Sequence, residues 1–191
     1  MSSSRVRKRY DAVYAEFEAV PPYMVAEIID GELVTSPRPG ATHTRAGSRL
    51  GMTIGGPFDL GENGPGGWVI LDEPELHLGT PADVLVPDLA GWRRQRMPQV
   101  PDTAAFDLAP DWVCEVLSTS TATLDRTAKM RIYGRESVEY VWLLDPIAHT
   151  LEVFHFGQTG WQALPPHRGA LRVRAVPFDA VELDLGVLWA K

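Results

Sequence analysis

The spacing of apolar residues predicts helices and strands that alternate along the chain. An apolar residue every three or four positions over residues 10–19 predicts a short amphipathic helix ahead of a pair of prolines. Residues 25–36 form two strand-like runs joined at Asp30-Gly31, which is a strong signal for a β-hairpin. Ala46, Leu50 and Ile54 recur at intervals of four, so we expect a second helix over residues 43–54.

The rest of the chain continues the alternation. Residues 55–67 are rich in Gly and Pro and lack the GK[ST] signature of a phosphate-binding loop, so they predict a flexible loop. The later elements are expected as strands at 68–78, 83–92 and 111–118, a helix at 123–136, a buried strand at 140–145, and strands at 150–156, 160–164 and 171–175. This order predicts an α/β fold with a mixed central sheet flanked by helices and a β-rich C-terminal extension.

Composition narrows the class of protein. The length of 191 residues indicates a single domain, which we expect over residues 22–191. Residues 1–21 are expected to form a basic N-terminal arm and a helix. One cysteine excludes a disulfide framework and a cysteine-rich zinc site. No apolar run reaches the length of a membrane span, and the N-terminus lacks the apolar stretch of a signal peptide. We therefore expect a cytoplasmic protein with no membrane partner.

The formal net charge of −7 argues against a protein that coats nucleic acid through bulk electrostatics. It leaves room for an enzyme that acts on nucleic acid, because carboxylates clustered around a divalent metal also make a chain acidic.

Two carboxylates lie inside otherwise apolar strands. Asp88 follows Pro87 in VLVPDLAGW, and Glu115 lies in DWVCEVLS. A buried acid is costly unless it is paired or holds a metal. If the two strands are neighbours, their carboxylates converge, and a hard cation such as Mg²⁺ relieves the repulsion between them. Magnesium held in this way suits phosphodiester hydrolysis.

Lys129 is the one lysine in the body of the chain, since the other two lie near the termini. It falls on the helix that follows the Glu115 strand, within reach of the end of that strand. Leu117 shares a face with Glu115 but carries no charge. Lys129 is therefore a candidate for orienting water or stabilising developing charge. The alternative is that it pairs with Asp125, four residues earlier, on a solvated helix face.

The order of these motifs resembles a known family. The hairpin EIIDGELVTSP, then Pro87-Asp88, EVLS, DRTAK, YVWLLDP and the closing LDLGVLWA are similar to the Uma-type restriction endonucleases of the PD-(D/E)XK nuclease superfamily. The resemblance implies a restriction-endonuclease-like fold. In the usual pattern of the superfamily the lysine comes two residues after the glutamate, where this chain has Leu117.

The resemblance also implies roles for individual residues. Asp88 and Glu115 would be metal ligands and Lys129 the catalytic lysine. Glu32 would add a carboxylate to the same pocket, and His43 would contact phosphate. The alternatives are that Glu32 is an exposed hairpin acid and that His43 only caps or pairs at the start of a helix.

The sequence thus predicts a DNA endonuclease that depends on Mg²⁺ or Mn²⁺. The competing hypothesis is a nuclease-like scaffold that binds protein or nucleic acid without turnover. We also expect a homodimer, because strands late in the chain carry aromatic residues that look exposed, namely Phe154, Phe156 and Trp161.

Overall fold

A computed structural model describes residues 2–190, and the side chains of residues 10–190. In chain order the elements are α1 (Ser2–Glu18), β1 (Met24–Ile29), β2 (Glu32–Pro37), α2 (Ala41–Ile54), the π-helix η1 (Gly55–Leu60), β3 (Trp68–Asp72), β4 (Glu75–Leu78), β5 (Asp83–Leu85), β6 (Leu89–Arg93), β7 (Ala105–Phe106), β8 (Trp112–Val116), α3 (Ala122–Leu124), the π-helix η2 (Asp125–Lys129), α4 (Met130–Arg135), β9 (Tyr140–Asp145), β10 (Thr150–Gly157), β11 (Gly160–Ala163), β12 (His167–Arg168), β13 (Arg172–Val173), β14 (Leu183–Asp184) and α5 (Leu185–Trp189).

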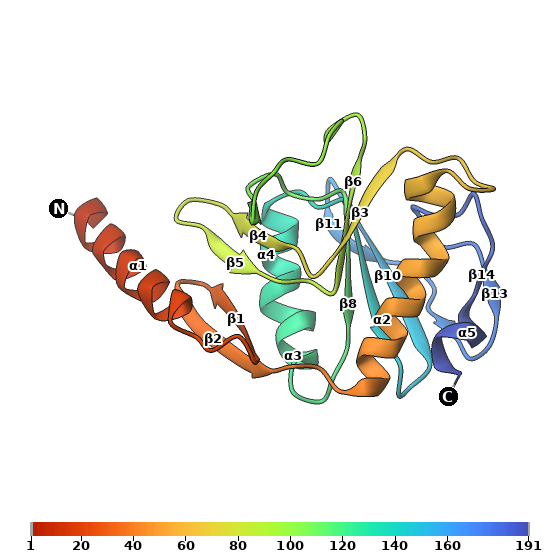
Figure 1. Ribbon diagram of the computed structural model, residues 1–191, viewed down its shortest axis with the longest axis horizontal. Helices are drawn as coiled ribbons and strands as arrows, with labels where there is room; N and C mark the ends of the chain where they lie inside the picture. The colour runs from red at the N-terminus through yellow and green to blue at the C-terminus, as the bar shows by residue number, and fades with distance from the viewer. Residues whose placement is uncertain (1, 191) are drawn as a thin grey trace.

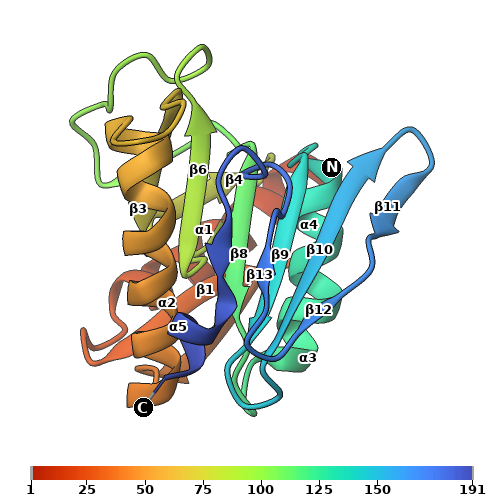
Figure 2. The same ribbon diagram turned by 90° about the vertical axis from the view of Figure 1, so that its right-hand side faces the viewer.

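A mixed sheet forms the centre of the molecule, with strand order β11-β10-β9-β8-β6-β3. Its strands pair antiparallel except for β8 and β9, which run parallel. Helix α2 covers one face of this sheet, and the helical run α3-η2-α4 covers the other (Figures 1 and 2). The predicted α/β class with helices on both faces is therefore confirmed.

A hydrophobic core lies on each side of the central sheet. One core joins α2 to the C-terminal segment through residues such as Leu50, Trp142 and Phe178. The other joins α4 to a second sheet, with strand order β2-β1-β5-β4-β7, through residues such as Leu85 and Ile132. Strand β8 is buried along its whole length, as its apolar sequence predicts.

Two predicted strands are each divided between the two sheets. The run at 68–78 becomes β3 in the central sheet and β4 in the second sheet, and the run at 83–92 becomes β5 and β6. Each break falls at a proline, Pro74 or Pro87, which has no N–H to donate to a ladder. The prediction of two continuous strands is therefore wrong, because the chain passes from one sheet to the other at each proline.

The hairpin and the second helix are confirmed, but the loop after that helix is not. Asp30 and Gly31 have φ values of 56° and 74°, which suit the tight turn between β1 and β2. Residues 55–60 continue α2 as the π-helix η1, and Phe58 is buried there against Phe178. This aromatic anchor explains why the Gly-rich segment is not a flexible loop at its start.

Helix α1 extends away from the body of the molecule (Figure 1). It begins at Ser2, earlier than predicted, and its Tyr14 ring contacts His77 of β4. The basic side chains of the predicted arm lie outside the described side chains, and the boundary at residue 21 stays a prediction. None of the helices within residues 2–190 has the length and apolar character that crossing a membrane requires.

The aromatic residues expected on an exposed surface are packed instead. Phe154 and Trp161 contact the core beneath α4, and the Phe156 and Trp161 rings meet edge to face. The indole N–H of Trp161 also donates to the carbonyl of Met130. These contacts hold α4 against β10 and β11. The three aromatic residues therefore give no support to the homodimer, which stays a prediction.

The close packing of α4 predicts opposite effects for two helical glycines. A Cβ added at Gly134 would lie 2.9 Å from both Phe156 Cε2 and Trp161 Nε1, whereas one at Gly47 in α2 would lie 3.7 Å from Val116 Cγ2. We expect Gly134→Ala to lower the free energy of unfolding by about 1–3 kcal/mol through overpacking. Gly47→Ala should raise it by about 0.5–1 kcal/mol, because alanine loses less backbone entropy in a helix. Urea denaturation measures both values, and equal effects at the two sites would contradict this packing.

Candidate active site

Asp88 and Glu115 meet at the end of the β6–β8 ladder. Leu89 lies opposite Cys114 in this antiparallel pair, so Asp88 comes level with Glu115. The backbone N–H of Val116 donates to Asp88 Oδ2 at 2.7 Å and fixes that carboxylate against β8. Side chains alternate along β8, so Glu115 faces the helical run while Cys114 enters the opposite core.

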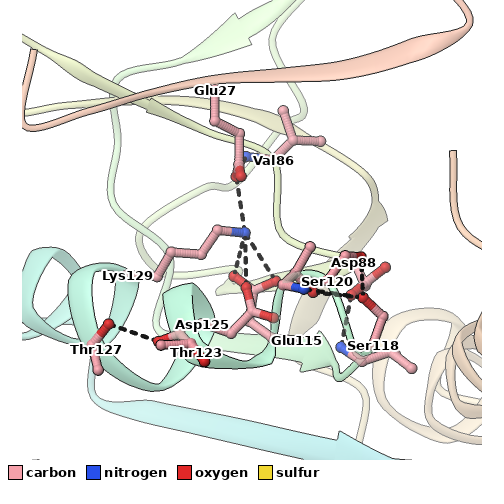
Figure 3. Close-up of polar contacts among 12 residues, drawn as sticks. Glu27, Val86, Asp88, Glu115, Ser118, Ser120, Thr123, Asp125, Thr127 and Lys129 are labelled. Carbon is pink, nitrogen blue, oxygen red and sulfur yellow. Dashed lines mark hydrogen bonds and ion pairs between the residues drawn. The ribbon is translucent and has the colours of Figure 1, made fainter. Parts of the chain in front are cut away.

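Lys129 lies at the centre of a group of carboxylates (Figure 3). Its Nζ atom is 2.9 Å from Glu27 Oε1, 3.2 Å from Glu115 Oε1 and 3.4 Å from Asp125 Oδ1. All four of these side chains are less than one-tenth exposed. The pairing of Lys129 with Asp125 is therefore present, but it is buried inside the site and not on a solvated face as the alternative interpretation supposed.

The hairpin contributes Glu27 to this group, and Glu32 lies elsewhere. Glu27 Oε1 also accepts a hydrogen bond from the backbone N–H of Val86 at 2.9 Å. Glu32 is exposed at the turn end of the hairpin, opposite Ile29, and does not line the cavity. Glu27 could have been recognised from the sequence, because it is an acid within the apolar run VAEII, the same signal that identified Asp88 and Glu115.

His43 lies in the first turn of α2 and contacts Asp88. Its Nε2 atom is 3.3 Å from Asp88 Oδ1, so Asp88 has one oxygen toward His43 and the other toward the β8 backbone. Burial lowers the pKa of His43, but the hydrogen bond to Asp88 and the Asp88 charge outweigh it. The pKa of His43 is therefore raised, which favours a cationic imidazolium beside the carboxylates.

One further residue, Tyr133, continues the row of site residues along the helical run. Asp125, Lys129 and Tyr133 are spaced four residues apart, and Tyr133 donates its phenolic O–H to Glu115 Oε1. The segment from Asp125 to Lys129 is a π-helical turn, a feature found frequently at functional sites. The four-residue spacing after Lys129 was the signal in the sequence that could have identified Tyr133.

The floor of a cavity of about 260 Å³ is formed by the charged side chains described above, namely Glu27, His43, Asp88, Glu115, Asp125 and Lys129. The lining residues are Val25, Glu27, Ser36, Pro37, Arg38, Pro39, Gly40, His43, Glu73, Val86, Asp88, Glu115, Ser118, Thr119, Ser120, Thr121, Asp125 and Lys129. Arg38 and Glu73 form an ion pair in the wall, with 3.3 Å between nitrogen and oxygen, and both are largely exposed. The segment 118–121 adds four hydroxyl groups to the wall.

Acidic groups outnumber basic groups on the floor of the cavity. Burial raises the pKa of Glu115 well above its ordinary value despite the opposing charge of Lys129. Burial likewise raises the pKa of Asp125. Burial alone would lower the pKa of Lys129, but Glu115, Glu27 and Asp125 together raise it well above the ordinary value. The lysine is therefore held as a cation, and its single charge faces three carboxylates.

The donor set fits a hard divalent cation. Asp125 Oδ1 is buried and has the Lys129 ammonium group 3.4 Å away, and Asp88 and Glu115 present carboxylate oxygens to the same cavity. Within residues 2–190, no three His, Cys, Asp or Glu side chains are already arranged as metal ligands. This is compatible with Mg²⁺, which is often bound through one or two carboxylates and keeps several waters.

The burial of Lys129 makes its contribution to stability large. We expect Lys129→Ala to lower the free energy of unfolding by about 3–5 kcal/mol, because the surrounding carboxylates lose their shared cation. Arg126, in the same helical turn, forms a partly exposed ion pair with Glu152. Arg126→Ala is the matched control and should cost less than about 1 kcal/mol. Similar losses of stability in urea denaturation would contradict the buried position of Lys129.

Comparison with known proteins bears on the fold and the family of the chain. No curated protein matches the chain. The fold is similar to a crystal structure of "a putative nuclease belonging to DUF820" from Anabaena variabilis, with a TM-score of 0.72, 22% identity and coverage of 93% of this chain and 97% of that one. Residues 14–186 match the Uma2 family, described as "Putative restriction endonuclease". The chain therefore belongs to the Uma2 family.

Proposed function

We propose that this protein is a Mg²⁺-dependent endonuclease that hydrolyses phosphodiester bonds in DNA, with Mn²⁺ able to replace Mg²⁺. The observation that carries the proposal is the convergence of Asp88, Glu115 and Lys129 in one cavity at the end of the β6–β8 ladder. Membership of the Uma2 family supports nuclease chemistry.

Asp88 and Glu115 would hold the metal ion, since their carboxylates come from adjacent strands and both line the cavity. Bound Mg²⁺ would polarise the phosphate and lower the pKa of an attacking water. Val116 and His43 each contact one oxygen of Asp88, and these contacts orient that carboxylate toward the cavity.

Lys129 would serve the reaction as a fixed positive charge. Its ammonium group is held in the cavity by Glu27, Glu115 and Asp125, so it needs no rearrangement to stabilise charge that develops on a phosphate. In this proposal Glu27 takes the place that the family resemblance implied for Glu32, because Glu27 Oε1 lies 2.9 Å from Lys129 Nζ.

His43 and the hydroxyl-bearing wall would face the DNA backbone. His43 lines the cavity beside Asp88, and its raised pKa favours a cation that attracts phosphate. Ser118, Thr119, Ser120 and Thr121 offer neutral hydrogen-bond donors on the neighbouring wall.

A cleavage assay with and without Mg²⁺ or Mn²⁺ tests this function. We expect cleavage that needs the metal, and a loss of more than about 100-fold in Asp88→Asn or Glu115→Gln, because a metal ion contributes several kcal/mol to transition-state stabilisation. Glu32→Gln is the matched control, since it makes the same chemical change on the hairpin outside the cavity. It should cleave at the wild-type rate.

The same assay separates the two functional hypotheses. Metal-independent cleavage, or full cleavage by Asp88→Asn, would contradict the assigned site. A wild-type protein that binds DNA but cleaves neither duplex nor single-stranded DNA with either metal would favour the scaffold that binds without turnover.

A further inference from the structure

Tyr133 has a polar contact that its place in the core does not require. The side chain is completely buried on α4, among apolar residues such as Ile132 and Val141. Its phenolic O–H is directed at Glu115 Oε1. A phenylalanine would fill the same volume without needing a partner for a hydroxyl group, so packing alone does not account for a tyrosine here.

Glu115 depends on few donors to fix its carboxylate. Lys129 Nζ lies 3.2 Å from Oε1 and 3.3 Å from Oε2, nearly equidistant from the two oxygens. Tyr133 contacts Oε1 alone. The phenol therefore distinguishes the two oxygens and leaves Oε2 as the one with fewer donors.

The fold holds Tyr133 rigidly in this position. Trp161 donates to the carbonyl of Met130 at 2.9 Å, and the Phe156 and Trp161 rings press against the helix at Gly134. Tyr133 lies between these two points of attachment on α4. These contacts fix the backbone of α4 on both sides of Tyr133.

We propose that Tyr133 is a positioning residue for the metal site, which orients Glu115 so that one carboxylate oxygen is available to a divalent cation. The inference rests on the proposed function, because it assigns Glu115 as a ligand. Partners that hydrogen-bond to metal ligands typically change metal affinity or activity by ten- to hundred-fold when they are removed.

Calorimetric titration of Tyr133→Phe with Mn²⁺ and with Mg²⁺ tests the role without relying on catalysis. We expect the dissociation constant for the metal to rise about ten- to hundred-fold relative to the wild type. The matched control is Tyr140→Phe, because Tyr140 lies on β9 outside the cavity and its phenol interacts with Glu139. This control should bind metal as the wild type does.

A thermal melt without metal shows whether each variant folds. If Tyr133→Phe proves too unstable to titrate, Trp161→Phe gives a second test, since it removes the hydrogen bond to Met130 that anchors the helix and leaves the Tyr133 phenol in place. It should weaken metal binding less than Tyr133→Phe, which is then titrated in a stabilising osmolyte.

The outcomes separate this inference from the proposed function. A wild-type protein that binds neither metal overturns the proposed function and this inference together. A wild-type protein that binds metal, combined with equal affinity in folded Tyr133→Phe, overturns only the role of Tyr133. A rise in the dissociation constant for both Tyr133→Phe and Tyr140→Phe would also overturn it, because the effect would then be general.

Discussion

The charge around Lys129 is the constraint on which the site depends. One buried ammonium group is shared by Glu27, Glu115 and Asp125, and Asp88 adds a further carboxylate to the same cavity. Buried charges are tolerated only when they are paired and hydrogen-bonded, and here the pairing is incomplete. In the proposed function this excess of acidic groups would attract a divalent cation, and it makes the cavity a costly part of the fold.

The two layers of the protein maintain this arrangement from opposite sides. The second sheet supplies Glu27 above Lys129, while the central sheet and the helical run supply Glu115 and Asp125 (Figure 3). Because the carboxylates belong to different elements, they can approach one another only when the whole domain is folded. The favourable packing of the core thus offsets the repulsion between the acidic groups, and such a loss of stability is common at functional sites.

Much of the site could be predicted from the sequence because it follows from local patterns. Asp88 and Glu115 stand out as acids in apolar strands, and Lys129 as the one lysine of the central chain. Glu27 carries the same signal but was passed over for Glu32, since a hairpin sequence alone does not show which of its ends faces the rest of the protein. The four-residue spacing of Tyr133 from Lys129 indicates a shared helix face, but the contact of Tyr133 with Glu115 is visible only in the structure.

Part of the fold could likewise be predicted from local sequence patterns. Strand β8 and helix α2 follow from apolar periodicity, and the hairpin turn follows from Asp30-Gly31. The division of two strands at Pro74 and Pro87 depends on the pairing of distant segments, which local patterns do not report. The π-helical turn at 125–129 carries Lys129, whose contacts with Glu27 and Glu115 likewise join distant segments.

The stability of Asp125→Asn, measured by urea denaturation in the presence of a chelator, tests the excess of negative charge most directly. Because burial raises the pKa of Asp125 in the folded protein, ionisation of this group costs stability as the pH rises from the ordinary aspartate pKa to the raised one, and the cost stays constant above it. The substitution keeps the shape of the side chain and removes its charge, while Lys129 keeps Glu27 and Glu115. We expect the variant to be more stable than the wild type at pH 7, with a difference that shrinks below about pH 4, where aspartate is protonated even in the unfolded chain. A variant less stable than the wild type at pH 7 would show that the carboxylates and Lys129 are already balanced, and would contradict this account.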